Sequence, residues 1–342
     1  MGRGTVYNNI TSLDKLEKIN PANRELGEDF LEYLSSVNRS PATIKNYRSD
    51  LNIFWVYCLE HLNNKFFIEL NKREIVKFQN YCLNKWGWGS ARIHRVKSCL
   101  SSLSNYIENI LDDEFEDYRG IIKKIESPSK NTVRQKSIFT EEQIDLLLDT
   151  LVATGRYYVA CAVALALYSG CRKAELAEFK VSWFDDSNLI VDGAMYKTPV
   201  EIRTKGHGKE GKPLYKYTLC DFKKYYDLWI EYRKKNGIES EWLFVRKTEN
   251  GYEQAKNTTF DSYAVTCSNI LNMPFYFHAL RHNLCTKLCK CNLPSKIIQE
   301  YFGWSNPSLI DVYDDSEASE DFGKYFTTKG IVQAKSGSLN DI

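Results

Sequence analysis

The chain has 342 residues, of which 43% are hydrophobic and 26% are charged, and glycine and proline are scarce. This composition excludes a disordered, collagen-like or low-complexity protein, and the length allows two domains. The net charge of only +2 does not by itself indicate a protein that binds nucleic acid. The longest apolar stretch, residues 157–168, is too short to span a bilayer, and the first residues lack the apolar core of a signal peptide. We therefore expect a cytoplasmic protein without a membrane segment.

The first third of the chain is predicted to be a helical bundle. Residues 1–22 are polar without a sustained period, so we expect a tail there. Ser40 and Pro41 provide an N-cap and a first-turn proline for a long amphipathic helix. The apolar spacing predicts helices over residues 26–34, 41–61, 72–85 and 90–111.

A basic segment follows the bundle. Between residues 119 and 136 there are six basic residues and one acid, and residues 126–137 have the composition of a linker. A second basic run, residues 201–216, has five basic residues against two acids, and either run alone is typical of a solvated loop. The predicted organisation is a tail, a helical domain, a linker, a larger domain and a second tail, over residues 1–22, 23–125, 126–137, 138–330 and 331–342.

The larger domain is predicted to be mostly helical with one inserted sheet. Thr140 and Gln143 form a capping-box sequence at the start of a helix, and an apolar helix follows over residues 157–168. Short apolar runs predict strands over residues 181–184, 189–191, 200–203 and 214–219. Helical periodicity returns over residues 223–234, 258–271, 278–290 and 295–302. The fold class is thus mainly α (α+β), a helical bundle plus a larger helical domain with a small antiparallel β-sheet.

Ten cysteines are scattered through the chain, as expected of small core residues in a reducing compartment. Only Cys285, Cys289 and Cys291 cluster. They could hold a metal if a fourth ligand joined them, but one helical turn separates the first two in an apolar segment. We favour core packing over a metal site.

Several polar residues at the ends of apolar helices can act together on one phosphodiester. Arg172 follows a glycine turn, with Glu175 placed to brace it, and His278 and Arg281 lie one turn apart near a helix start. Two arginines can grip the nonbridging oxygens and offset the charge of a pentacoordinate transition state without a metal. A tyrosine such as Tyr313 can attack phosphorus, and a lysine can protonate the leaving oxygen.

In this order the residues resemble the tyrosine recombinase (phage integrase) family, in particular its Cre-like and Xer-like simple site-specific recombinases. The family's pattern is an arginine with a nearby glutamate, a lysine on a β-turn, His-x-x-Arg, a histidine or tryptophan, and a tyrosine. The residues that match it here are Arg172 and Glu175, Lys205, His278 and Arg281, Trp304, and Tyr313. Lys205 is the least distinctive match, because Lys197, Lys209 and Lys212 are neighbours that a shift of register could substitute. Each residue alone has an ordinary structural explanation, and the resemblance to the family depends on all of them occurring together in this order.

The resemblance implies a site-specific DNA recombinase that cleaves and rejoins duplex DNA through a 3′-phosphotyrosine, with no cofactor. It implies that residues 23–125 are a core-binding domain, that residues 138–330 are catalytic, and that His282 supports catalysis beside Glu175. The basic residues expected to contact DNA are Lys45, Arg48, Arg92, Arg95, Lys97, Lys130, Arg134, Lys136 and Arg203. Alternatives with related chemistry or fold are a type IB topoisomerase-like enzyme, a telomere resolvase, and a catalytically silent DNA-binding protein.

The resemblance also implies an assembly, a homotetramer on two double-stranded DNA sites with inverted half-sites. Residues 316–330 contain apolar residues at helical spacing beside acidic ones, which predicts a short amphipathic helix. We expect this segment to be donated to a neighbouring protomer, and the alternative is that it packs on its own catalytic domain.

Overall fold

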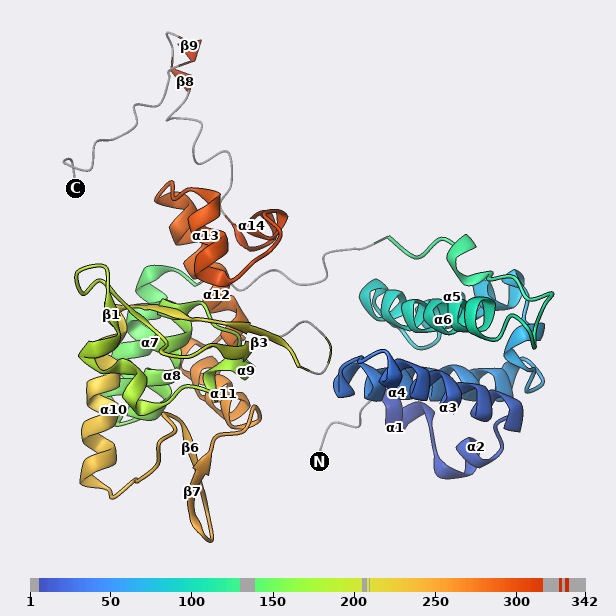
Figure 1. The fold of residues 1–342 in the computed structure, drawn as a ribbon, viewed down its shortest axis with the longest axis horizontal. Coiled ribbons are helices and arrows are strands. Elements are labelled where there is room, and N and C mark those ends of the chain that lie inside the picture. The colour runs from blue at the N-terminus through green and yellow to red at the C-terminus, as the bar shows by residue number, and fades with distance from the viewer. Residues whose placement is uncertain are drawn as a thin grey trace. The chain divides into compact units, whose positions relative to one another are not determined.

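The computed structural model describes residues 6–129, 139–204, 208 and 210–315, and the backbone of residues 326–327 and 330–331. The chain divides into two compact units, Met1–Gln135 with Gly206–Gly211, and Lys136–Lys205 with Lys212–Ile342 (Figure 1). Apart from the expected tail over residues 1–22, the finer domain limits given above remain predictions.

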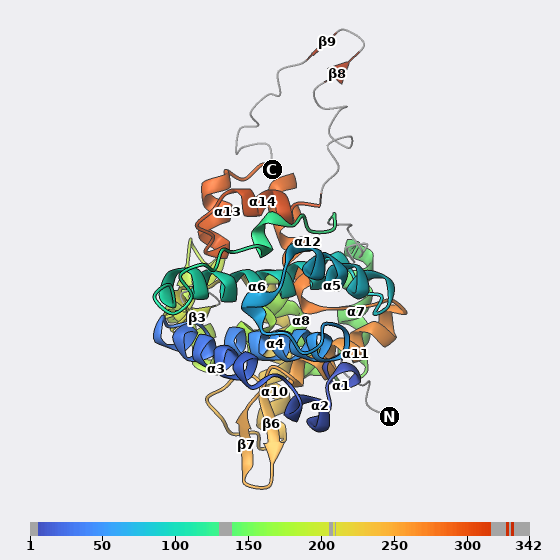
Figure 2. The ribbon, with the colours of Figure 1, turned by 90° about the vertical axis from the view of Figure 1, so that its right-hand side faces the viewer.

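The first unit is a helical bundle. Its elements are α1 (Val6–Ile10), α2 (Leu13–Glu17), α3 (Pro21–Ser36), α4 (Pro41–His61), the 3-10 helix η1 (Phe67–Glu69), α5 (Lys72–Asn84), α6 (Ser90–Ile110) and the 3-10 helix η2 (Ile122–Lys124). Ser40 caps α4 as expected, since its hydroxyl accepts the Thr43 N–H at 3.2 Å. Figure 2 shows α4 running beside α3 and α6, and the three helices enclose an aromatic core around Phe54 and Trp55.

The prediction of a tail over residues 1–22 is wrong for the residues from 6 onwards. α1 and α2 both pack on α4, and Ile10 and Ile19 are buried in the core of the first unit. The segment is also held by polar contacts, because the Asn20 N–H donates to Asn64 Oδ1 at 3.0 Å. Two buried isoleucines are too few to give a visible period, which is why the sequence pattern did not reveal these helices.

The second unit is mostly helical with small antiparallel sheets. Its helices are α7 (Glu141–Ala153), α8 (Tyr157–Ser169), α9 (Lys173–Leu176), α10 (Lys223–Lys235), α11 (Thr259–Leu271), α12 (Phe277–Lys290), α13 (Ser295–Phe302) and α14 (Ser308–Tyr313), with 3-10 helices η3 (Val181–Phe184), η4 (Asp186–Asn188) and η5 (Cys220–Phe222). The strands are β1 (Leu189–Ile190), β2 (Met195–Lys197), β3 (Ile202–Thr204), β4 (Lys212–Leu214), β5 (Tyr217–Leu219), β6 (Val245–Thr248), β7 (Gly251–Gln254), β8 (Phe326–Thr327) and β9 (Gly330–Ile331).

The strands pair in small groups. β1, β2 and β5 form a three-stranded sheet, and β3–β4, β6–β7 and β8–β9 form two-stranded ribbons. In the β3–β4 ribbon Thr204 pairs with Lys212, so residues 205–211 connect the two strands. The mainly helical class with a small antiparallel sheet is confirmed.

One predicted strand is a 3-10 helix. Residues 181–184 form η3, and the adjacent side chains of Trp183 and Phe184 are both buried. Alternating strand geometry would send these neighbours to opposite faces, whereas a helical turn lets both pack inward. The predicted strand over residues 214–219 is two strands, β4 and β5, separated by Tyr215 and Lys216.

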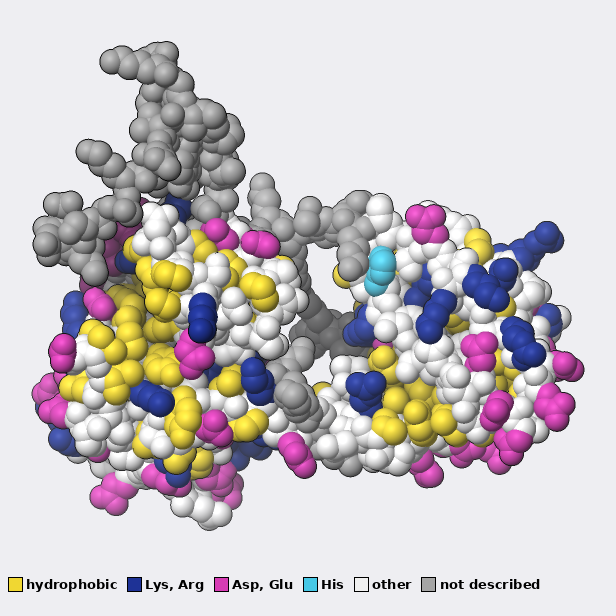
Figure 3. All heavy atoms as spheres, turned by 45° about the horizontal axis from the view of Figure 1, so that its top comes forward, with side chains coloured by type: hydrophobic (Ala, Val, Ile, Leu, Met, Phe, Trp, Pro, Cys, Tyr) yellow, Lys and Arg dark blue, Asp and Glu magenta, His cyan; other side chains and the backbone are white. Residues whose placement is uncertain are grey.

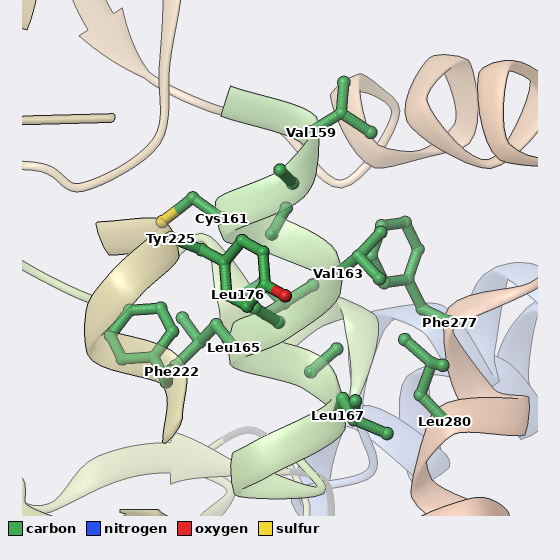
Figure 4. Packing of buried hydrophobic residues seen from close by; sticks show 14 of the residues in the cluster. Val159, Cys161, Val163, Leu165, Leu167, Leu176, Phe222, Tyr225, Phe277 and Leu280 are labelled. Carbon is green, nitrogen blue, oxygen red and sulfur yellow. The ribbon is translucent and has the colours of Figure 1, made fainter. Parts of the chain in front are cut away.

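The apolar helix α8 runs through the core of the second unit. Val163 and Leu165 on α8 are fully buried, and Figure 4 shows Phe222 and Tyr225 packed on one side and Phe277 on the other. A helix covered on all sides needs apolar residues around its whole circumference, which explains its sequence. Within the described residues no helix combines the length and apolar character needed to cross a membrane.

Candidate active site

The buried helix α8 positions Arg172. It ends at Gly170, whose φ of 58° is left-handed, and a Cβ there would lie 2.2 Å from an atom of the Phe302 ring. Only glycine fits this turn. The chain then reaches Arg172, which caps α9 and remains partly exposed. The rigid core therefore fixes where this guanidinium emerges.

Glu175 braces Arg172 as the sequence predicted. Its Oε2 accepts the backbone N–H of Arg172 at 2.9 Å, and its Oε1 lies 3.1 Å from Arg172 Nη1. Glu175 Oε2 also lies 2.9 Å from Nζ of Lys216, and both partners of this ion pair are buried. Burial acts to raise the pKa of Glu175, but the charge of Lys216 and the contacts with Arg172 outweigh it and hold the pKa below its usual value.

Arg281 on α12 is the second arginine, and it is completely buried. Its Nη1 donates to the carbonyl of Gly170, and its guanidinium carbon lies 4.6 Å from the ring centroid of Phe302 and 5.0 Å from that of Trp304. The Nε atom of Arg281 and the indole Nε1 of Trp304 are buried without a hydrogen-bond partner among the described residues. Buried donors are normally satisfied, so these two mark a place where an acceptor is expected.

Tyr313 lies against this arginine and against His278. The Tyr313 hydroxyl is 3.2 Å from His278 Nε2, and the guanidinium carbon of Arg281 is 5.4 Å from the Tyr313 ring centroid. The Trp304 ring packs on Tyr313 with centroids 4.9 Å apart. Tyr313 ends α14, Trp304 follows α13, and Arg281 and His278 lie on α12, so three elements of the second unit converge here.

His282 lies one turn after His278 and also contacts Tyr313. Its ring centroid is 4.6 Å from that of Tyr313, and its Nδ1 lies 2.9 Å from Oδ2 of Asp315, whose side chain is almost fully buried. The backbone N–H of Asp315 donates to the hydroxyl of Thr286 at 2.9 Å. The chain is thus tied to α12 immediately after the tyrosine.

The electrostatics of the site keep His278 uncharged near neutral pH. Partial burial and the positive charges of His282, Arg281 and Arg172 lower the pKa of His278 to about 4. Burial followed by the charge of Arg172 lowers the pKa of Arg281 as well, although an arginine remains charged.

The structure brings together Arg172, Glu175, His278, Arg281, Trp304, Tyr313 and His282 from the predicted site. Lys205 lies outside the described residues. Its neighbour Lys212 is described, and its Nζ donates to the carbonyl of Gly303 at 3.2 Å. Cys285 is buried in the cluster around Tyr313 while Cys291 is exposed, and the described residues contain no group of three metal-ligating side chains.

Four of the basic residues predicted to contact DNA lie on the surface of the first unit. Lys45 and Arg48 are exposed on α4, and Arg48 pairs with Glu28. Arg95 is half-exposed and bonds through Nε and Nη2 to the buried carboxylate of Asp50, while Arg92 stacks over a tryptophan. Figure 3 shows Lys and Arg side chains spread over the viewed face of the first unit, at the right, with most acidic ones along its lower edge.

Lys97 differs from these residues because it is buried. Its Nζ donates to the carbonyls of Ile125 at 2.7 Å and Glu126 at 3.1 Å, so its charge holds the end of the first unit onto α6. The prediction that Lys97 contacts DNA is corrected to a structural role. Lys130, Arg134 and Lys136 lie outside the described residues, and Arg203 is exposed on β3.

Sequence reasoning missed two residues around the site. Asp315 has no motif of its own, and only its contact with His282 reveals it. Lys216 was counted within the second basic run, where a solvated loop was the simplest interpretation. The sequence offered no signal for its burial, because its partner Glu175 lies far away along the chain.

Comparison with known proteins identifies relatives that align with most of the chain. The family model described as "Phage integrase family" matches residues 137–320, more than half of the sequence. The chain is 28% identical over 322 residues to the SPbeta prophage-derived recombinase-like protein YomM of Bacillus subtilis. This alignment covers 91% of this chain and 92% of that protein. It is also 26% identical to a tyrosine recombinase of Thermosipho africanus, in an alignment that covers 84% of this chain and 93% of that protein.

Solved structures share the fold at low sequence identity. XerH site-specific recombinase bound to palindromic difH substrate aligns with a TM-score of 0.61 at 14% identity, over 82% of this chain and 78% of that one. A lambda integrase tetramer bound to a Holliday junction aligns with a TM-score of 0.60 at 16% identity, over 85% of this chain and 77% of that one.

Proposed function

Because the chain belongs to the phage integrase family and is a tyrosine recombinase that acts site-specifically on DNA, we propose that Tyr313 is its nucleophile. The observation that carries this assignment is the contact of the Tyr313 hydroxyl with His278, 3.2 Å apart, beside the guanidinium of Arg281. Attack forms a bond between Tyr313 Oη and phosphorus and breaks the bond from phosphorus to the 5′-oxygen. The product is a 3′-phosphotyrosine.

The two arginines hold the nonbridging oxygens of the scissile phosphate. Arg172 is oriented by Glu175, and Arg281 is fixed by Gly170 and the surrounding rings. The buried donors Arg281 Nε and Trp304 Nε1 gain an acceptor when phosphate enters. Fixed donors of this kind stabilise the charge that develops in the transition state.

Two groups move protons. His278 is neutral near pH 7 because its pKa is lowered to about 4, so its Nε2 can accept the proton of Tyr313 during attack. Lys205 donates a proton to the leaving 5′-oxygen, a role that rests on the family pattern alone. Rejoining by a 5′-hydroxyl reverses these steps and needs neither ATP nor a metal, because the bond energy is kept in the phosphotyrosine.

We assign DNA contact to the exposed basic residues of the first unit and to the segment that links the units. The partner is double-stranded DNA with inverted half-sites, bound by a homotetramer on two sites, and the reaction is performed in the cytoplasm on nucleoid or mobile-element DNA.

Exchange of the segment after Asp315 connects the protomers. Ending the chain after Asp315 would then preserve half-site binding and abolish synapsis, which gel shifts with half-site and full-site DNA measure. A full synaptic complex of the truncated protein would show that the segment is not the connector.

A nicked suicide duplex tests the reaction itself. The duplex carries the half-site selected from a random DNA pool, and the short cleaved strand diffuses away so that the covalent complex accumulates. Covalent trapping excludes a silent binder, and joining of the trapped strand to a second duplex excludes a pure topoisomerase. Binding without any adduct would contradict the proposed function.

A further inference from the structure

A lysine with no assigned role lies directly behind Arg172. Lys216 has an exposed fraction of only 2%, and its backbone is fixed because its N–H donates to Thr198 Oγ1 at 3.0 Å and its carbonyl accepts the Thr198 N–H at 2.9 Å. Its Nζ lies 2.9 Å from Glu175 Oε2. A charge buried to this degree is costly unless it is paired, so Lys216 must have a partner to be tolerated there.

Glu175 is shared between Lys216 and Arg172. One carboxylate oxygen receives Lys216 Nζ and the Arg172 backbone N–H, and the other receives Arg172 Nη1. Glu175 is itself 2% exposed, so water cannot replace any of these donors. The side-chain rotamer of Glu175, and through it the direction of the Arg172 guanidinium, therefore depends on Lys216.

The charges of Arg172, Glu175 and Lys216 together set the net charge that faces the phosphate. Arg172 with Glu175 alone would be electrically neutral, and a neutral pair attracts a phosphate weakly. Lys216 adds one positive charge on the far side of Glu175 and leaves a net charge of +1 facing the substrate. Its burial and its pairing exclude Lys216 from donating a proton to the leaving group.

Resting on the proposed function, we propose that Lys216 is a positioning residue that acts through Glu175: it balances the carboxylate so that Arg172 keeps both its orientation and its charge for the scissile phosphate. The role is distinct from that of Lys205, because Lys216 never touches DNA. Loss of the charge should slow cleavage without weakening DNA binding.

Two substitutions separate charge from shape. Lys216→Gln keeps a hydrogen-bond donor near Glu175 but removes the charge, and Lys216→Arg keeps the charge. Lys235→Gln is the matched control, because it removes an exposed lysine that is paired with Glu231 on the same unit. Melting temperature and half-site binding are measured for each variant, so that only folded proteins are compared.

The readout is the rate of covalent adduct formation at saturating protein on the nicked duplex, with either a normal or a methylphosphonate scissile linkage. The methylphosphonate is neutral before attack and carries one negative charge fewer than the normal linkage in the transition state, so it depends less on the charge of the two arginines. We expect Lys216→Gln to slow cleavage of the normal duplex by roughly 10- to 100-fold, less than the loss of a direct donor, and to slow the neutral duplex by less than about threefold. Lys216→Arg and Lys235→Gln should stay within about fivefold of the unmodified protein.

Three results would overturn the proposal: an unchanged rate in Lys216→Gln, an equal loss on both duplexes, or a Lys216→Arg rate no faster than that of Lys216→Gln. If Lys216→Gln does not fold, the Lys216→Arg comparison on the two duplexes decides, because a selective loss on the charged duplex in a variant that keeps the charge would contradict the mechanism. Failure of the proposed function is a separate outcome, in which the unmodified protein forms no adduct at all.

Discussion

The two arginines of the proposed active site in the second unit are held differently from two exposed basic residues of the first unit. In the second unit Arg172 and Arg281 are fixed by a carboxylate, a carbonyl and aromatic rings. In the first unit Lys45 and Arg48 extend from an exposed helix face. The difference indicates two uses of positive charge, because preorganised donors accelerate a reaction whereas mobile surface charges contribute affinity that depends on salt.

The largest effect is expected at the buried arginine. Arg281→Lys removes the planar fork that bonds Gly170 and faces Tyr313, and a lysine cannot reproduce this geometry. Adduct formation should fall by about 100- to 1000-fold. Single-turnover cleavage on the suicide duplex measures this, with half-site binding as the control. A loss below tenfold would show that Arg281 is a packing residue.

A substitution of Lys97 tests whether this buried lysine stabilises the first unit instead of contacting DNA. Lys97→Met leaves the carbonyls of Ile125 and Glu126 without their donor and should reduce the free energy of unfolding by about 1–3 kcal/mol. The salt dependence of DNA binding should not change. Urea denaturation measures the free energy of unfolding, and a salt titration of DNA binding measures the salt slope. A smaller salt slope with an unchanged free energy of unfolding would show that Lys97 contacts DNA after all.

Replacing Arg48 should have the opposite effect to replacing Lys97, because it should change DNA binding and leave the stability of the first unit nearly unchanged. Its pair with Glu28 is exposed on both sides, so Arg48→Ala should change the free energy of unfolding by less than about 1 kcal/mol. If Arg48 contacts a phosphate, the slope of log K against log salt should become shallower by about 0.9. An unchanged slope would place the DNA on another face of the first unit.

The last prediction concerns His278, whose pKa should lie near 4 instead of 6.5. Between these values the unfolded chain binds more protons than the folded one, so this group's contribution to stability is lost as the pH falls from 6.5 towards 4. NMR titration of the imidazole, assigned with His278→Gln, tests the shift. A pKa at or above 6.5 would contradict the lowered pKa that the site geometry predicts for His278.

The residues proposed as catalytic could be picked out from the sequence because the chemistry needs particular residue types in a fixed order, and the structure places His278, Arg281 and Tyr313 beside one another. Lys97 could also have been placed correctly, since it lies four residues after Ile93 and three before Leu100 on the buried face of its helix. Lys216 and Asp315 could not, because their roles depend on contacts with Glu175 and His282 that are distant in sequence. The helical turn at residues 181–184 was missed for the same reason, since packing and not propensity decides it.

The most direct test of the account is to identify the residue that becomes attached to DNA. Peptide mapping of the trapped complex should locate the nucleotide on Tyr313, and Tyr313→Phe should bind the half-site normally and form no adduct. Tyr301 is a poor alternative, because its hydroxyl donates to the backbone carbonyl of Tyr168, whereas the Tyr313 hydroxyl contacts His278. An adduct that persists in Tyr313→Phe, or that maps to Tyr301 or Tyr325, would contradict the account.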